Sequence, residues 1–318
     1  MNVIEINNLT KDFGNNKGIF DLSFSLKQGE IVGFLGSNGA GKTTTIRHLM
    51  GFIKANTGSA KIANMDCFHN AHLVQEKIGY LPGEIAFMDN MTGEEFIQFM
   101  ADMKSITDLQ YAKELIVYFD IDTKIKIKKM SKGMKQKIGL IIAFMQDPPI
   151  LILDEPTTGL DPLMQTKFVD LIKKEKAKGK TILMSSHIFE EIENTCERIV
   201  MIKDGRLVAD ENINTMRNKM NKHYEISFSN MEDAIHFQEL YSTNSYRKNN
   251  VVYLLSNQNI NHLIRELGKF NIEDINARHQ TLEEVFEYSN AIVHAFQKFR
   301  APFSGKIVHI FPEQSAVI

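Results

Sequence analysis

The amino-acid sequence predicts an α/β fold with a parallel sheet, on three observations. Apolar runs typical of buried strands occupy residues 30–36, 150–154 and 181–186. Helix-like stretches separate these runs, as they do where parallel strands alternate with helices. Each run ends at a glycine-rich or polar segment that carries reactive side chains. Because the carboxyl ends of such strands meet at one edge of an open sheet, these segments would share one crevice.

Length and composition describe an ordinary globular protein. The chain has 318 residues, of which 43% are hydrophobic and 24% are charged. That length allows a sizeable core and more than one domain, at about 100–200 residues each. The formal net charge of -2 lacks the basic excess of most proteins that act on nucleic acid. The two cysteines, Cys67 and Cys196, lie far apart, which argues against a disulfide framework or a zinc site and fits a reducing compartment.

The sequence predicts neither a signal peptide nor a membrane span. The N-terminus, MNVIEINNLTKDFG, lacks the apolar segment of a secretory signal. The longest apolar stretch, residues 138–145, is far shorter than the ~20 residues that a spanning helix needs. A role at a membrane would therefore depend on another chain.

The first 217 residues carry the pattern of one domain with two subdomains. Short strands in its N-terminal part predict an antiparallel β subdomain, and a run of helices predicts a helical subdomain at about 84–147. Besides the three buried strands, the expected elements are strands at 3–9, 20–26 and 58–63, helices at 94–103, 109–119, 135–145 and 162–178, and a hairpin at 198–210 that turns at Asp204-Gly205.

Residues 218–318 predict a smaller α+β accessory domain with a tail. The capping box formed by Thr281 and Glu284 marks the start of a long final helix with one largely apolar face. The expected elements are strands at 223–229 and 249–256, helices at 232–241, 259–270 and 281–299, and a strand-like tail at 306–311.

The segment GSNGAGKT, residues 36–43, fits the phosphate-binding pattern G-x-x-x-x-G-K-[ST]. It follows a strand and precedes a helix-like run, which is the context that the pattern requires. Its glycines allow a tight turn whose N–H groups point at phosphate oxygens, and the helix N-terminus adds partial positive charge. Lys42 would reach the β- and γ-phosphates, and the hydroxyl of Thr43 would bind Mg²⁺. The alternative, a plain glycine-rich turn, fits this context poorly.

Three further side chains follow the other two buried strands. Asp154 ends the strand ILILD and suits Mg²⁺, and Glu155 is placed to polarise an attacking water. His187 follows TILMSS and would hydrogen-bond the γ-phosphate. Two surface carboxylates and a structural histidine are the alternatives. Their shared position, at strand ends beside a phosphate loop, favours the catalytic interpretation.

With these motifs, the chain resembles the ATP-binding subunits of ABC transporters. Five family motifs occur in order: Walker A GSNGAGKTT, a signature-like MSKGMKQ at 130–136, Walker B ILILDEP, the D-loop TGLDP and the switch histidine His187. The signature variant and the stretch TLEEVF near the C-terminus are similar to those of bacterial exporters of the ABC-2 and drug-resistance type. The resemblance covers about residues 1–290, and it is most specific over 1–215.

The resemblance implies a fold, a site and partners. The fold is a P-loop NTPase with a RecA-like core. Two copies, or one copy and a paralogous ATPase, would enclose two Mg-ATP and drive a separate transmembrane permease, as an exporter, from the cytoplasmic face of the membrane. Glu155 would be the general base, while Lys42 and His187 stabilise charge. The implied nucleotide-binding residues are Phe13, Gly36, Ser37, Asn38, Gly39, Ala40, Gly41, Lys42, Thr43, Thr44 and Asp161, with Ser131 and Gly133 supplied by the second subunit; Thr43, Asp154 and Glu84 would serve the metal.

Two positions depart from the family pattern. The glutamine that normally follows proline in the Q-loop is Gly83 here, and Glu84 comes one residue later. The aromatic that stacks on adenine is usually a tyrosine, and Phe13 fits that position. A phenylalanine ring can stack as well, although a core aromatic is the alternative.

An uninterrupted lysine-rich run surrounds the signature-like segment. No acidic residue occurs between Lys124 and Lys137. Ser131 is a good N-cap for a helix that begins at about Lys132, and Gly133 would let a phosphate approach closely. The run therefore indicates a solvated face around a phosphate cap. A nucleic-acid patch is the alternative, and with it the second function hypothesis, an ABC ATPase that acts on nucleic acid or ribosomes. A single P-loop and a short helical insertion favour transport.

Overall fold

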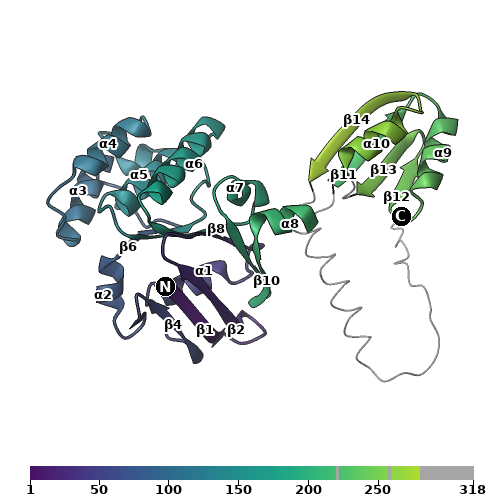
Figure 1. Ribbon diagram of the computed structural model, residues 1–318. Helices are drawn as coiled ribbons and strands as arrows, with labels where there is room; N and C mark the ends of the chain where they lie inside the picture. The colour runs from purple at the N-terminus through teal and green to yellow at the C-terminus, as the bar shows by residue number, and fades with distance from the viewer. Residues whose placement is uncertain (220–221, 257–258, 280–318) are drawn as a thin grey trace, which may run out of the picture. The chain divides into compact units, whose positions relative to one another are not determined.

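The computed structural model describes residues 1–219, 222–256 and 259–279, which form three sheets with helices between and beside them (Figure 1). The expected final helix at 281–299, its capping box and the strand-like tail at 306–311 lie outside the described residues. Among the helices in the described ranges, none combines the length and apolarity that crossing a membrane requires.

The N-terminal sheet is antiparallel, as the sequence predicts. Its strands run in the order β2-β1-β4-β5, and β1 pairs with both β2 and β4. From Leu22 to Leu26, alternate residues of β2 are buried, which is the pattern of a sheet with one face on a core. The strands are β1 (Asn2–Asp12), β2 (Gly18–Lys27), β4 (Thr57–Ile62) and the short β5 (Met65–Asp66).

The central sheet is mostly parallel and positions the site. Its order is β10-β9-β3-β8-β7-β6, and only β10 runs antiparallel to its neighbour. Every residue of β3, β7 and β8 is buried, because helices or the other sheet cover both faces. The strands are β3 (Ile31–Leu35), β6 (Ile78–Leu81), β7 (Ile150–Asp154), β8 (Thr181–Ser186), β9 (Arg198–Lys203) and β10 (Arg206–Asn212). The three predicted buried strands and the hairpin are confirmed, and Asp204 and Gly205 form its turn with φ of 48° and 73°.

One hydrophobic core joins these two sheets. Helix α1 (Lys42–Leu49) contributes Ile46 and Leu49 to a buried cluster that also includes Ile4 of β1, Phe34 of β3 and Ile152 of β7. The helix that follows the phosphate loop is therefore anchored by its apolar side.

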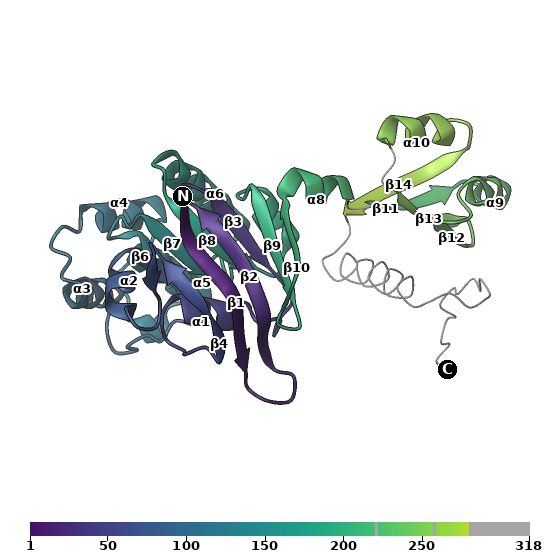
Figure 2. The ribbon, with the colours of Figure 1, turned by 60° about the horizontal axis from the view of Figure 1, so that its bottom comes forward.

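The helices α3 (Gly93–Met103), α4 (Gln110–Tyr118) and α5 (Lys132–Phe144) pack together, because α5 contacts both of the others, and α3 and α4 lie away from β1 and β2 in both views (Figures 1 and 2). Thr92 and Glu95 form a capping box at the start of α3. The remaining helices of this part are α2 (Ala71–Glu76), the 3₁₀ turn Ile127–Lys129, α6 (Pro162–Ala177), α7 (Phe189–Glu193) and α8 (Ile213–Lys219).

A third sheet, with two helices, follows α8. Its order β12-β13-β11-β14 and the chain path βαββαβ are those of a ferredoxin-like unit. It has its own core, in which Phe228, Phe237 and Leu263 are buried. The elements are β11 (Lys222–Phe228), α9 (Met231–Leu240), β12 (Ser245–Lys248), β13 (Val251–Ser256), α10 (Ile260–Leu267) and β14 (Ile272–His279). The expected strands and helices up to residue 270 are confirmed, whereas β12 and β14 were not anticipated; the domain boundary at 217/218 stays a prediction.

Candidate functional site

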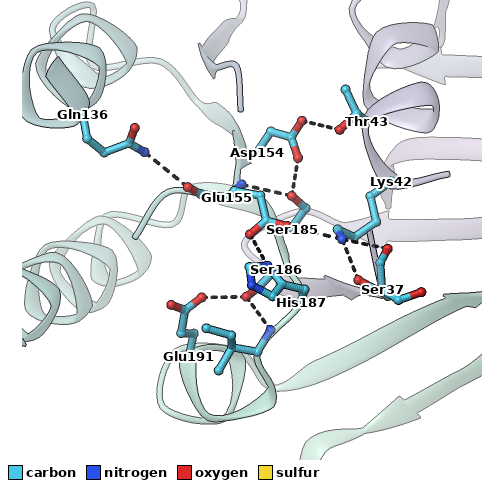
Figure 3. Close-up of polar contacts among 12 residues, drawn as sticks. Ser37, Lys42, Thr43, Gln136, Asp154, Glu155, Ser185, Ser186, His187 and Glu191 are labelled. Atoms are coloured by element: carbon cyan, nitrogen blue, oxygen red, sulfur yellow. Dashed lines mark hydrogen bonds and ion pairs between the residues drawn. The ribbon is translucent and has the colours of Figure 1, made fainter. Parts of the chain in front are cut away.

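The phosphate loop connects β3 to α1 and exposes its backbone at the end of the strand. Gly41, the residue before α1, has φ of 112°, and a Cβ there would lie 2.8 Å from the side chain of Ile19. A glycine is therefore required for the turn. The buried ammonium of Lys42 folds back over the loop, with Nζ 2.5 Å from the carbonyl oxygen of Gly36 and 3.3 Å from that of Ser37 (Figure 3).

A hydroxyl and a carboxylate from different elements meet beside this loop. Thr43 Oγ1 lies 2.9 Å from Asp154 Oδ2, and Asp154 is fully buried at the end of β7. Its other oxygen, Oδ1, accepts a hydrogen bond from Ser185 of β8 (Figure 3). Hydroxyl and carboxylate oxygens are ligands that Mg²⁺ prefers, so this pair fits the predicted metal.

Glu155 occupies a conformation that non-glycine residues seldom adopt. Its φ is 52°, and its N–H donates to Ser185, with the carbonyl oxygen at 3.3 Å and Oγ at 3.1 Å. Such strain is characteristic of functional sites, where the surrounding structure enforces it. The turn directs the carboxylate into the crevice, where Oε1 lies 3.3 Å from Lys42 Nζ and Oε2 lies 2.7 Å from His187 Nδ1.

These groups line one cavity of about 1010 Å³ at the carboxyl ends of the parallel strands. Of the predicted site residues, those that line it are Phe13, Ser37, Asn38, Gly39, Gly41, Lys42, Thr43, Thr44, Glu84, Asp154, Glu155 and His187. Gly36 and Ala40 belong to the phosphate loop but do not line the cavity, and their carbonyl oxygens accept hydrogen bonds from Lys42 Nζ and from the N–H of Gly205, respectively. Phe13 is exposed, with its ring open to the cavity, and Lys11 Nζ lies 5.6 Å from the ring centroid.

Besides Gly36 and Ala40, three predicted residues outside the phosphate loop also lie outside the lining of this cavity. Ser131 caps α5, and its Oγ accepts a hydrogen bond from the N–H of Met134 at 3.2 Å. A Cβ at Gly133 would lie 2.5 Å from the carbonyl oxygen of Gly159 in the D-loop. Asp161 caps α6 in the same way, accepting from the N–H of Met164 at 3.0 Å. Within one chain, Ser131 and Asp161 therefore serve as helix caps, and Gly133 lies close to the D-loop backbone.

The lysine run is only partly a free surface. Lys132 lines the cavity, Lys135 lies 3.9 Å from Asp89, and Lys137 donates to the carbonyl oxygen of Phe119 at 2.9 Å.

Several site residues were not found from the sequence. Arg47 and Tyr80 line the cavity, and burial together with the nearby charge of Asp154 raises the pKa of Tyr80 to about 12. Ser185 links Asp154 to the backbone of Glu155. Gln136 donates to the carbonyl oxygens of Glu155 and Pro156 at 3.2 and 2.9 Å. Only Ser185 and Gln136 had a local signal, since Ser185 lies in the strand-like run TILMSS and Gln136 lies in the signature-like segment MSKGMKQ.

Comparisons with known proteins agree on the type of protein. A family model described as "ABC transporter" matches residues 19–158. The chain is 36% identical over 240 residues to the bacitracin transport ATP-binding protein BcrA of Bacillus licheniformis, covering 74% of this chain and 78% of that protein. It is 34% identical over 212 residues to the linearmycin resistance ATP-binding protein LnrL of Bacillus subtilis (strain 168), covering 65% and 68%.

Solved structures share the fold of the ATPase part. An ATP-binding subunit of an ABC transporter, 29% identical, superposes with a TM-score of 0.63 over 68% of this chain and 92% of its own. The ATP-binding cassette MJ0796, solved as a dimer with ADP and Pi, is 23% identical with a TM-score of 0.60 over 66% and 98%. At that identity, the second likeness concerns the fold alone.

Proposed function

The chain belongs to the ABC transporter ATP-binding proteins, and from that membership we propose that it hydrolyses Mg-ATP, paired with a second ATPase subunit, to drive a separate membrane permease. The observation that carries the proposal is the convergence of Lys42, Asp154, Glu155 and His187 in one cavity beside the phosphate loop. Fold membership alone would not assign these roles.

Phosphate binding falls to the loop and Lys42. In the described arrangement, Lys42 Nζ is held by two loop carbonyls and by Glu155, so it is already aimed across the loop. The β- and γ-phosphates would take over these contacts and free the Glu155 carboxylate. Phe13 would stack on adenine at the open side of the cavity.

Thr43 and Asp154 would hold Mg²⁺, directly or through water, with Glu84 as a further oxygen donor. When bound, the ion would neutralise phosphate charge. Ser185 fixes the Asp154 carboxylate, because its hydroxyl donates to the oxygen that faces away from Thr43.

Water activation falls to Glu155. Its turn and the contact with His187 Nδ1 place the carboxylate at the cavity wall, where it would orient a water and accept its proton. Lys42 and His187 would stabilise the charge that develops on the transferred phosphoryl oxygens.

The second half of each site would come from another subunit, either a second copy or a paralogous ATPase. Helix α5 has thirteen residues, and its N-terminus presents Ser131 and Gly133 outside the cavity of their own chain. Free N–H groups and the helix dipole suit a γ-phosphate held by the partner. Asp161 would contribute at the same interface through the D-loop.

Transport is the proposed purpose of hydrolysis. The relatives BcrA and LnrL are named for bacitracin transport and linearmycin resistance. We infer that this chain likewise serves an exporter of antibiotic-like or other drug molecules. Its place would be the cytoplasmic face of the membrane, where the permease recruits it.

The substitution Glu155→Gln tests the chemistry. The amide fills the same space but accepts no proton, so ATP binding should persist while turnover falls by about 10²- to 10⁴-fold. Nucleotide binding by equilibrium titration and phosphate release would be measured on the full chain, with and without its permease. Wild-type turnover in the variant would remove Glu155 from the reaction.

A further inference from the structure

The turn that carries His187 is supported from behind by a carboxylate. Ser186, the last residue of β8, is 1% exposed. Its Oγ accepts a hydrogen bond from the N–H of Ile188 at 2.9 Å and donates one to Glu191 Oε2 at 2.6 Å (Figure 3). Its carbonyl oxygen also accepts from the N–H of Gly36 at 3.3 Å. His187 is therefore the middle residue of a turn, here called the 186–188 turn, that is tied to the phosphate loop.

The two hydrogen bonds of Ser186 depend on one another. A hydroxyl has a single proton, so donation to Glu191 fixes its rotation and aims a lone pair at Ile188. A bond to a carboxylate is shorter and stronger than a neutral one, and it polarises the hydroxyl as an acceptor. Without the carboxylate, the hydroxyl is free to rotate, and the 186–188 turn loses its closing contact.

The imidazole has little packing to hold it. The side chain of His187 is 43% exposed, and Nδ1 meets Glu155 Oε2 at 2.7 Å. The direction of the side chain thus depends largely on the backbone of the turn. Glu191 itself lies outside the nucleotide cavity and lines a different one of about 310 Å³, with residues of α6 and β8.

We propose that Glu191 is a positioning residue for ATP hydrolysis: through Ser186 it holds the 186–188 turn so that His187 faces Glu155 and the nucleotide cavity. The proposal rests on the role of His187 in the proposed function. The side chain of Glu191 bonds to Ser186 and does not line the nucleotide cavity, so we assign its effect to the turn.

The substitution Glu191→Ala should lower turnover while leaving the affinity for ATP nearly unchanged. Misplacement of a catalytic group by about an ångström lowers the rate by up to about 10²-fold, so kcat should fall by about 10- to 100-fold. The KM for ATP and the melting temperature should stay close to wild type, because the phosphate loop keeps its own contacts. Glu191→Gln retains an acceptor oxygen and should recover much of the loss.

Thr166→Val is the matched control. Thr166 lines the same 310 Å³ cavity, and its hydroxyl donates to the carbonyl oxygen of Pro162, one turn earlier in α6. Its kcat should equal that of the wild type. Should Glu191→Ala fail to fold, Ser186→Ala removes the same link from the other side and should give the same separation of kcat from KM.

A double-mutant cycle with His187→Ala decides whether Glu191 acts through the imidazole. If it does, the double variant should turn over no more slowly than His187→Ala alone. Independent, multiplicative losses, or full kcat in Glu191→Ala, would overturn the positioning role while leaving the proposed function intact. Full turnover in His187→Ala would overturn the role of His187 and the positioning role together.

Discussion

At the scale of single residues, the absence of a side chain at Gly83 leaves space for the Asp154 carboxylate. A Cβ at this position would lie 3.2 Å from Asp154 Oδ2, the oxygen that Thr43 contacts. The glutamine that the family usually has at this position would place its Cβ against the same oxygen. Glu84, one residue later, is exposed and lines the cavity, so its carboxylate can approach without that crowding.

If Glu84 replaces the missing glutamine, Glu84→Ala should lower Mg²⁺-dependent turnover or its stimulation by the permease. Glu84→Gln should retain activity, because an amide oxygen can still bind the ion. Gly83→Ala should be milder than Glu84→Ala, since its methyl group displaces Asp154 by only a few tenths of an ångström. ATPase rates against Mg²⁺ concentration, with and without permease, would measure this. Identical curves for wild type and Glu84→Ala would show that Glu84 does not perform the role of the missing glutamine.

His48 gives the phosphate-loop helix a dependence on pH. The ring is buried on α1, and Nδ1 lies 2.8 Å from the carbonyl oxygen of Thr44. Burial lowers the pKa of His48, outweighing the hydrogen bond to Thr44. The folded state therefore favours the neutral ring.

Acid should consequently weaken the fold through His48. A depressed pKa contributes stability that is present above the unfolded-state value of 6.5 and is lost as the pH falls toward the folded-state value. The free energy of unfolding should decline below pH 6.5, and the decline should be smaller in His48→Gln. His72→Gln, at an exposed position of α2, should follow the wild type. Parallel curves for wild type and His48→Gln, from urea unfolding across pH, would contradict the assignment.

At the scale of elements, α4, α6 and the start of β8 meet at a buried carboxylate. Glu175 of α6 is 1% exposed, and it accepts a hydrogen bond from Tyr111 of α4 at 2.6 Å. It also pairs with Lys178 at 2.8 Å and with the buried Lys180, which in turn pairs with Asp147. Burial raises the pKa of Glu175, but its bonds to Lys178, Lys180 and Tyr111 outweigh burial and lower it. The cluster therefore joins the helical segment to the central sheet.

Removing one cation from this cluster should be costly. Lys180→Met leaves the buried carboxylate short of a partner, which typically lowers the free energy of unfolding by about 3–5 kcal/mol. Lys176→Met is the control, because Lys176 pairs with Glu197 at the surface, where the two side chains are 37% and 56% exposed. An exposed pair contributes about 0–1 kcal/mol. If urea unfolding showed equal losses of unfolding free energy in the two variants, the buried cluster would contribute no more to stability than the exposed pair.

Elements marked by a local sequence pattern, such as an apolar run or an N-cap, could be predicted. Elements that form only through pairing with neighbouring strands could not. The strand ILILD and the helix capped by Ser131 follow from an apolar run and an N-cap, and both are confirmed. Strands β12 and β14 lie at sheet edges and are rich in polar residues, so backbone pairing rather than an apolar run holds them. Arg47 and Tyr80 reach the cavity only because α1 and β6 converge there, which no local pattern records.

At the scale of the whole molecule, each proposed site would consist of two chains. Lys42→Ala should abolish hydrolysis by removing the phosphate-binding charge. Ser131→Arg should abolish it by filling the space where the partner's phosphate must lie. In a mixed dimer, both defects fall in one site, and the other site receives an intact phosphate loop and an intact α5 N-terminus. Mixing the two inactive proteins should therefore restore ATP-dependent closure at one site.

Dimerisation in ATP, with Glu155→Gln added to both chains, is the appropriate measurement, because turnover would stay low if both sites must act together. Each variant alone provides the control. If subunits exchange but the mixture behaves as the sum of the two homodimers, Ser131 has no role in the partner's site, and the nucleic-acid interpretation of the lysine run regains weight.

The order of the strands in the central sheet has a consequence for how this protein is made. Strand β3, which holds the phosphate loop, lies between β8 and β9, and Leu35 pairs with Ser186 on one side and Met201 on the other. In addition, the N–H of Gly205 donates a hydrogen bond to the carbonyl oxygen of Ala40, in the phosphate loop, at 2.9 Å. During translation, the loop sequence emerges long before these neighbours do, and pairing between segments so far apart forms late. We expect a nascent chain of which fewer than about 205 residues have emerged to expose the whole loop sequence yet bind no nucleotide, so ATP could assist folding only after nearly the entire ATPase part has left the ribosome.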